Sequence, residues 1–253
     1  IAELPRDELV IVTKVFNHFN DDGTRYPDLS PEHITARCDV SLGRMGIDMI
    51  DLYLLHMYDP FTPLDDIAAV LERLREEGKI RAYGVSNHTV EQLRAHRHHG
   101  NYTVVQPPYS LIEPAGEEDL LPYCQSERIG VMVYSPLHKG LLSGKYDGTE
   151  SFTDFRQNHP DFSGDRFLGL AQAVRDLAPI AERNELTIYQ LVLAATLMHP
   201  GIDVAVCGIK RQDQITEALG AMGRTISRED YFEVRKIVGP GSPKVADAKG
   251  SQK

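Results

Sequence analysis

The chain has 253 residues, of which 42% are hydrophobic, and this is enough for one large globular domain. A formal net charge of −10 argues against nucleic acid or an anionic membrane as a general partner. The sequence contains neither an apolar run of eighteen residues nor a secretory signal pattern. Cys38, Cys124 and Cys207 are too far apart for a CxxC site, so we expect buried, reduced thiols in a cytoplasmic protein.

Short apolar runs alternate with helical patterns along the chain. The expected strands are residues 9–14, 49–56, 82–86, 103–106, 130–134 and 203–208. The expected helices are residues 31–46, 62–78, 89–97, 117–127, 165–184, 187–199 and 212–222, with a last helix from Ser227 and a tail at 240–253. Residues 143–164 read as a long polar loop, and a shorter one includes residues 20–23. This alternation predicts a single domain with a parallel sheet wrapped by helices.

The fold class that we predict is α/β, a (β/α)8 TIM barrel. An open doubly wound sheet is the alternative, but it usually has a glycine-rich fingerprint after its first strand, and no GxGxxG occurs in the sequence. A closed barrel of this kind needs eight strands, whereas six are visible. We therefore expect that about two N-terminal βα units of the barrel are missing from the chain.

Polar side chains stand at the ends of five successive strands. Because side chains alternate between the faces of a strand, Lys14 shares a face with Val10 and Val12, and His56 shares one with Leu52 and Leu54. If the apolar members fill the barrel interior, the polar members line its mouth, where barrel enzymes keep their active sites. The residues predicted there are Lys14, His56, Asn87, Gln106 and Tyr134. Tyr53 falls on the opposite face, toward the helices, and is not expected to be catalytic.

The chemistry of this set suits a nicotinamide beside a proton donor. A lysine in an apolar barrel either pairs with a carboxylate or has a lowered pKa, and it can lower the pKa of a nearby tyrosine. Asn87 and Gln106 offer both donors and acceptors to an amide ligand. Tyr134 offers a flat face on which a heteroaromatic ring can stack.

The sequence resembles the aldo-keto reductase superfamily over essentially its whole length. The segments that carry the resemblance are IVTK at 11–14, IDLYLLH at 50–56, EGKIRAYGVSN at 77–87, VQ at 105–106, YSPL at 134–137 and GLLSGKY at 140–146. Together and in this order they are highly specific. The resemblance implies a TIM barrel that binds NADPH without a Rossmann motif and reduces an aldehyde or ketone to an alcohol.

The resemblance also implies roles for individual positions. Lys14 and His56 match two members of the family's catalytic tetrad. The positions that match cofactor-binding residues are Ser86, Asn87, Gln106, Tyr134, Ser135, Leu137, Gly140, Leu141, Gly208, Lys210, Arg211, Gln214 and Glu217. Lys210 and Arg211, just before a helix, also suit a 2′-phosphate, so NADPH is expected rather than NADH. No metal site is expected.

Two positions depart from the family pattern. Ala218 stands where the family usually has an asparagine that contacts adenine, which is expected to weaken cofactor binding. The family's catalytic aspartate and tyrosine lie before the Lys14 strand, and nothing in residues 1–9 matches that segment.

Two other functions remain open. One is a non-catalytic NADPH-binding module resembling potassium-channel β subunits, which a chain without the tyrosine would suit. The other is a metal-dependent barrel hydrolase built on His96, His98 and His99, but these residues lie at a helix end, and we expect them to be a solvated cluster. The oligomeric state and the particular carbonyl substrate are not readable from the sequence.

Overall fold

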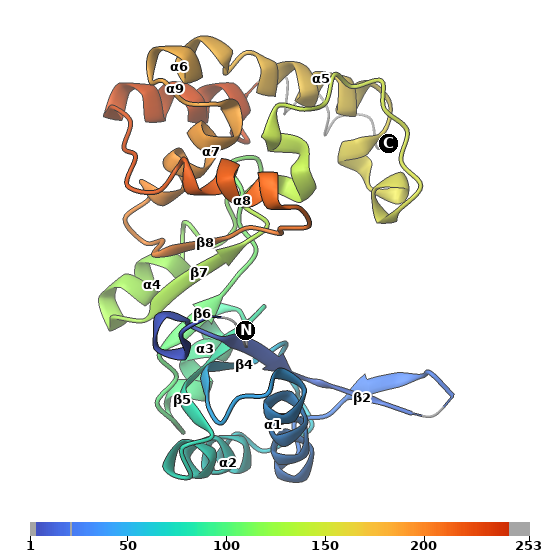
Figure 1. The fold of residues 1–253 in the computed structure, drawn as a ribbon, viewed down its shortest axis with the longest axis vertical. Coiled ribbons are helices and arrows are strands. Elements are labelled where there is room, and N and C mark those ends of the chain that lie inside the picture. The colour runs from blue at the N-terminus through green and yellow to red at the C-terminus, as the bar shows by residue number, and fades with distance from the viewer. Residues whose placement is uncertain (1–3, 21, 243–253) are drawn as a thin grey trace. The chain divides into compact units, whose positions relative to one another are not determined.

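The computed structural model describes residues 4–20 and 22–242, so most of the expected tail at 240–253 lies outside the described residues. The chain forms two compact units (Figure 1). The first contains Ile1–Pro107 and Asp119–Val131, and the second contains Pro108–Glu118 and Met132–Lys253.

Six strands form one parallel sheet in the order β1-β4-β5-β6-β7-β8. Their bounds are β1 Val12–Val15, β4 Ile50–Leu55, β5 Ile80–Ser86, β6 Val104–Gln106, β7 Gly130–Tyr134 and β8 Val204–Val206. The division between the units falls within β7, so β1, β4, β5 and β6 belong to the first unit and β8 to the second. The six predicted strands are all present, and their alternation with helices is that of part of a (β/α)8 barrel.

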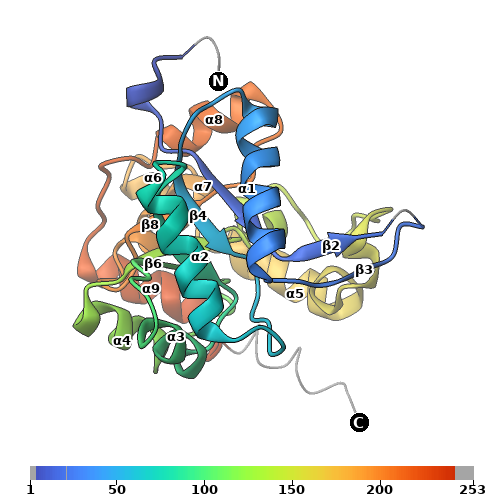
Figure 2. The same cartoon turned by 90° about the horizontal axis from the view of Figure 1, so that it is seen from below.

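Helices cover the sheet of the first unit. They are α1 Pro31–Met45, α2 Leu64–Glu76, α3 Val90–Arg97 and α4 Leu120–Glu127, and a short 3-10 helix, η1, spans Arg6–Glu8. Figure 2 shows α1 and α2 side by side against the strands. The predicted limits of α1 are confirmed because the Ser30 side chain accepts a hydrogen bond from the His33 N–H, and Gly46 ends the helix with φ +64°.

A short antiparallel hairpin is the element that sequence reasoning missed in this unit. Strands β2 (Asn17–Phe19) and β3 (Arg25–Pro27) pair where a polar loop was predicted, with His18 opposite Tyr26. Each strand has only three residues, so the alternation that identifies a strand is too short to be seen. The hairpin extends away from the parallel strands next to α1 (Figures 1 and 2).

The second unit is mainly helical. Its helices are α5 Gly164–Arg175, α6 Ala178–Arg183, α7 Ile188–Leu197, α8 Gln212–Leu219 and α9 Arg228–Val238, with 3-10 helices η2 His138–Ser143, η3 Phe155–Asn158 and η4 Pro160–Phe162. The prediction of one helix over 165–184 is wrong. The chain turns between α5 and α6, and Pro179, which lacks an N–H to donate, lies in the first turn of α6. The capping box at Thr187 is confirmed.

Burial follows the predicted alternation only in part. Leu52 and Leu54 are at most 6% exposed, but all six residues of β4 are buried. In β7, the residues between the predicted inner positions Met132 and Tyr134 are the more buried ones, and Val10 is 75% exposed because β1 begins only at Val12. At the other end of the strands, the buried Asp51 carboxylate accepts hydrogen bonds from the Ile11 N–H at 2.8 Å and from Arg6 at 2.7 Å.

All three cysteines are free thiols, as predicted, although only Cys38 and Cys124 are fully buried and Cys207 is half-buried. Within residues 4–20 and 22–242, no helix is long and apolar enough to cross a membrane.

Candidate active site

Polar residues from three adjacent strand ends are hydrogen-bonded to one another in the first unit. The Asn87 side-chain amide donates to the His56 carbonyl at 2.9 Å and to Ser86 Oγ at 3.2 Å. Ser86 Oγ in turn donates to the Gln106 carbonyl at 2.8 Å, and the Asn87 N–H donates to the same carbonyl at 3.2 Å. The ends of β4, β5 and β6 are therefore fixed to one another through these predicted site residues.

Asn87 adopts a left-handed backbone conformation with φ +58°, which is uncommon outside glycine. Strained backbone of this kind costs free energy and is concentrated at functional sites. It turns the chain sharply after β5, so that the side-chain amide points back to the end of β4. Ser86 and Gln106 are buried, with 1% and 4% exposure, whereas Asn87 is half-buried.

Lys14 and His56 interact electrostatically. Burial lowers the pKa of the half-buried Lys14 ammonium. His56 is exposed, yet burial of part of its ring lowers its pKa, and the nearby Lys14 charge lowers it further. The two residues predicted to be catalytic therefore lie in one electrostatic environment, at the ends of the paired strands β1 and β4.

The side chains of Ser86, Asn87 and Gln106 fit a carboxamide. They supply hydroxyl and amide groups, which both donate and accept hydrogen bonds, as a primary amide requires. The lowered pKa values of Lys14 and His56 mean that burial disfavours the charged forms of both side chains, and groups with shifted pKa values are typical of proton-transfer sites.

The second unit carries Tyr134 and the loop that follows it. Tyr134 is half-buried, burial raises its pKa, and its carbonyl accepts the Tyr109 N–H at 3.1 Å. The loop then has positive φ at Ser135, His138 and Lys139, followed by Gly140 at φ +94°. The loop positions predicted to bind the cofactor are Ser135, Leu137, Gly140 and Leu141, and of these Leu141 is buried and the others are half-buried. Positive φ at several positions of one short loop costs free energy, and such conformations are concentrated at functional sites.

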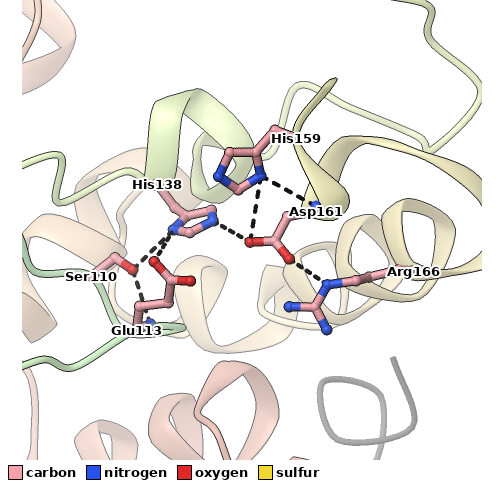
Figure 3. Close-up of polar contacts among 6 residues, drawn as sticks. All are labelled: Ser110, Glu113, His138, His159, Asp161 and Arg166. Atoms are coloured by element: carbon pink, nitrogen blue, oxygen red, sulfur yellow. Dashed lines mark hydrogen bonds and ion pairs between the residues drawn. The ribbon is translucent and has the colours of Figure 1, made fainter. Parts of the chain in front are cut away.

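A buried polar network holds this loop, and sequence reasoning missed it (Figure 3). His138 Nε2 lies 2.6 Å from the Asp161 carboxylate, whose other oxygen accepts a hydrogen bond from Arg166 Nε. On its other side, His138 Nδ1 contacts Ser110 Oγ at 3.3 Å and lies 3.7 Å from the Glu113 carboxylate. The network joins three segments that no spacing or periodicity in the sequence connects.

The charges in this network favour ionised Asp161. Burial alone would raise the pKa of the carboxyl, but hydrogen bonds from His138 and Arg166 lower it to about 2. Both His138 and Asp161 are at most 2% exposed. The long 143–164 loop is thus attached to the Tyr134 loop by a buried, charge-assisted contact.

The predicted adenosine-binding residues lie around the start of α8. Gln214 Oε1 accepts the N–H groups of Lys210 and Arg211 at 2.7 and 3.1 Å. The exposed Arg211 guanidinium forms an ion pair with Asp213 at 2.7 Å, so part of its charge is already compensated. Gly208 is exposed, and Glu217 accepts a hydrogen bond from Thr187 of the α7 cap.

Two further expectations concern residues outside the site. Tyr53 is fully buried, and its hydroxyl lies 3.5 Å from the Ile34 carbonyl of α1, which confirms that it faces the helices. The prediction of a solvated histidine cluster is wrong for His96, which is fully buried, whereas His98 is exposed and His99 pairs with Asp65 at 2.5 Å.

A parallel sheet in the order β1-β4-β5-β6-β7-β8 that alternates with helices is part of a (β/α)8 barrel, and polar residues stand at the carboxyl ends of its strands, where such barrels have their active sites. Residues 2–238 match the model of the Aldo/keto reductase family. The chain therefore belongs to this family of oxidoreductases.

Three proteins illustrate what the chain is similar to. It is 33% identical over 249 residues to the NADH-specific methylglyoxal reductase of Escherichia coli (strain K12), a match that covers 94% of this chain and 76% of the relative. It is 32% identical over 233 residues to a putative voltage-gated potassium channel subunit beta of Schizosaccharomyces pombe, covering 86% and 67%. The structure of a glycerol dehydrogenase from Gluconobacter oxydans matches with a TM-score of 0.88 and 29% identity, covering 94% of this chain and 74% of that one.

Proposed function

We propose that this chain belongs to an NADPH-dependent reductase that converts small aldehydes or ketones to alcohols. The observation that carries the proposal is the hydrogen-bonded set of Asn87, Ser86 and Gln106 beside His56, within an aldo/keto reductase fold. The methylglyoxal reductase and glycerol dehydrogenase among its relatives make a short, polar carbonyl compound the expected substrate.

In the proposed mechanism the chain's own residues bind and orient. Ser86, Asn87 and Gln106 would hold the carboxamide of the nicotinamide. The cofactor, when bound, supplies a hydride. His56 would donate a hydrogen bond to the substrate oxygen and orient the carbonyl.

Lys14 would adjust the acidity of the proton donor, which the family resemblance identifies as a tyrosine. Because Lys14 is partly buried, its charge interacts more strongly with neighbouring groups than it would in water. The described segment before β1, residues 4–11, contains no tyrosine.

The preference for NADPH over NADH is part of the same proposal. Lys210 and Arg211 at the start of α8 would pair with the 2′-phosphate, although Asp213 competes for Arg211. The relative from Escherichia coli is NADH-specific, so the preference needs its own test. Lys210→Met is expected to weaken NADPH binding about tenfold, as for one lost charged contact, and to leave NADH binding unchanged.

The test of the function measures cofactor binding by calorimetry and cofactor oxidation at 340 nm with methylglyoxal. Lys14→Met is expected to lower kcat at least about 100-fold while the cofactor Kd changes little, because general acid catalysis contributes roughly this much. The matched control is Lys236→Met, on the exposed side of α9. Cofactor binding without any turnover would instead support a non-catalytic module, which the similarity to a potassium channel subunit beta favours.

A further inference from the structure

Two histidines and an aspartate of the first unit meet beside the β2–β3 hairpin, and none of the three is used in the proposed function. His18 comes from β2, Asp28 from the link after β3, and His33 from the first turn of α1. One possible ligand atom of each residue lies within 4.8 Å of those of the other two. His33 is 9% exposed, and the His18 ring stacks on Tyr26 with centroids 4.8 Å apart.

The aspartate of this cluster is held in place before any ligand binds. The Asp28 N–H donates to the Phe16 carbonyl at 2.8 Å, and Asp28 Oδ1 accepts the Ser30 N–H at 2.9 Å. Asp28 Oδ2 is therefore turned toward the two imidazoles. The His33 N–H donates to the Ser30 side chain, which caps α1 at the position of this histidine. A hydrogen bond to the second oxygen of a ligating carboxylate, like the one from the Ser30 N–H, is typical of metal sites.

The distances between these ligand atoms are those of a metal site. His18 Nδ1 and His33 Nδ1 lie 3.4 and 3.6 Å from Asp28 Oδ2. A hydrogen bond between an imidazolium and a carboxylate is shorter, about 2.7–2.9 Å. By contrast, Zn²⁺–ligand bonds of about 2.0–2.1 Å in a tetrahedron place neighbouring ligand atoms about 3.3 Å apart.

An unpartnered nitrogen is a second observation. His18 Nδ1 is one of several buried side-chain atoms in the described part of the chain that have no hydrogen-bond partner. A buried polar atom without a partner costs free energy, and a bound ion is one of the explanations for such an atom in a native structure. Because His18 Nδ1 lies 3.4 Å from Asp28 Oδ2, the two atoms can bind one ion together.

A second His-His-Asp cluster in the described structure, made of His138, His159 and Asp161, lacks these properties. There the His138–Asp161 distance of 2.6 Å is that of a direct hydrogen bond, and Arg166 donates to the same carboxylate (Figure 3). A guanidinium at a carboxylate repels a cation, and the hydrogen bond occupies the imidazole nitrogen. This cluster is a buried ion-pair network.

We propose that His18, Asp28 and His33 form a binding site for one divalent transition-metal ion, with Zn²⁺ as the expected metal. Two imidazoles and one carboxylate are a ligand set that Zn²⁺ favours, and a water would complete a four-coordinate site. The ion would attach the hairpin to the start of α1. The proposal does not depend on the reductase function.

The test uses the full chain after removal of metal with a chelator. Calorimetry with Zn²⁺ is expected to show one equivalent bound per chain. Co²⁺ is expected to give visible absorption bands of a four-coordinate site, and Zn²⁺ is expected to raise the unfolding temperature by a few degrees. His18→Ala and Asp28→Asn are expected to weaken Zn²⁺ binding at least tenfold.

These variants are chosen to keep the fold. The His18 side chain is 41% exposed, and asparagine at position 28 retains the oxygen that accepts the Ser30 N–H. His98→Ala, which removes an exposed histidine of the α3 end, is the matched control and is expected to bind Zn²⁺ like the unmodified chain. The proposal is overturned if no stoichiometric Zn²⁺ binds, if His18→Ala and Asp28→Asn bind it unchanged, or if only His138→Ala reduces binding.

Discussion

The Asn87 side-chain amide donates a hydrogen bond to the main-chain carbonyl of His56 across 2.9 Å, and this bond joins the end of β5 to the end of β4. The bond therefore holds the backbone of His56, which we propose to be catalytic, through the side chain of Asn87, which we propose to bind the cofactor. The left-handed backbone of Asn87 makes the contact possible, because an extended residue there would continue along β5.

This contact leads to a prediction about Asn87. Asn87→Ala is expected to weaken cofactor binding about tenfold through the lost amide, and to destabilise the fold by about 1 kcal/mol because alanine disfavours positive φ. Asn87→Gly keeps the backbone conformation and removes the amide, so it isolates the loss in binding. Calorimetric Kd values and urea unfolding of both variants separate the two effects. Equal Kd values for Asn87→Gly and the unmodified chain would contradict the assignment.

The His138–Asp161 network predicts how acid affects the second unit. The folded-state pKa of Asp161, about 2, lies below the usual value near 3.9, so the folded chain binds fewer protons than the unfolded chain between these values. The network therefore stabilises the fold fully above about pH 4, and this contribution is lost as the pH falls toward 2.

Asp161→Asn removes the carboxylate and leaves Arg166 and His138 with a neutral partner. We expect a loss of about 3–5 kcal/mol in unfolding free energy at pH 7, since removing one partner of a buried ion pair leaves the other charge unpaired, and a flatter stability profile between pH 4 and 2. Urea unfolding across this pH range measures both. Exposed Asp165→Asn is the control, and an unchanged acid profile in Asp161→Asn would refute the assignment.

Gly84, in the middle of β5, permits the close approach of β6. A Cβ at this position would lie 2.1 Å from the Val104 carbonyl oxygen, which is backbone and cannot move without disturbing the sheet. Gly84→Ala is expected to destabilise the chain by more than about 2 kcal/mol, as overpacking of a core does. Gly208→Ala is the control, since nothing lies within 4 Å of its Cβ and its φ is not positive. Thermal unfolding that is equal in the two variants would rule out this explanation.

His96 makes the first unit sensitive to mild acid. It is enclosed by Tyr58, His88 and Tyr102, with ring centroids 5.9, 5.0 and 4.9 Å away. Burial lowers the pKa of His96 to about 3, far below the usual 6.5. Between these values the unfolded chain binds a proton that the folded chain does not, so stability falls as the pH is lowered through this interval.

His96→Phe is expected to reduce the slope of unfolding free energy against pH by about 1.4 kcal/mol per pH unit, which is the contribution of one proton. His88 stays in the variant, and because burial also lowers its pKa, to about 4, part of the slope remains. Unfolding free energies at pH 4, 5 and 6 measure the change. His98→Ala is the matched control, and a slope in His96→Phe that equals that of the control would contradict the prediction.

The sequence alone determined the parallel α/β order, the strands, and most helix limits. These features depend on local chemistry: apolar runs of strand length, Ser30 and Thr187 at helix starts, and Gly46 at a helix end. The positions at the strand ends followed from alternation and from the family motifs, because both are written in consecutive residues.

Only the tertiary structure decided which polar groups meet. His138 and Asp161 are 23 residues apart, His18 and His33 belong to different elements, and the burial of His96 depends on Tyr58 and Tyr102. Hydrogen bonds and burial between distant residues depend on how elements pack, and neither periodicity nor composition carries that information. For this reason the sequence identified the family and its expected site residues, whereas the buried network and the proposed metal site required the structure.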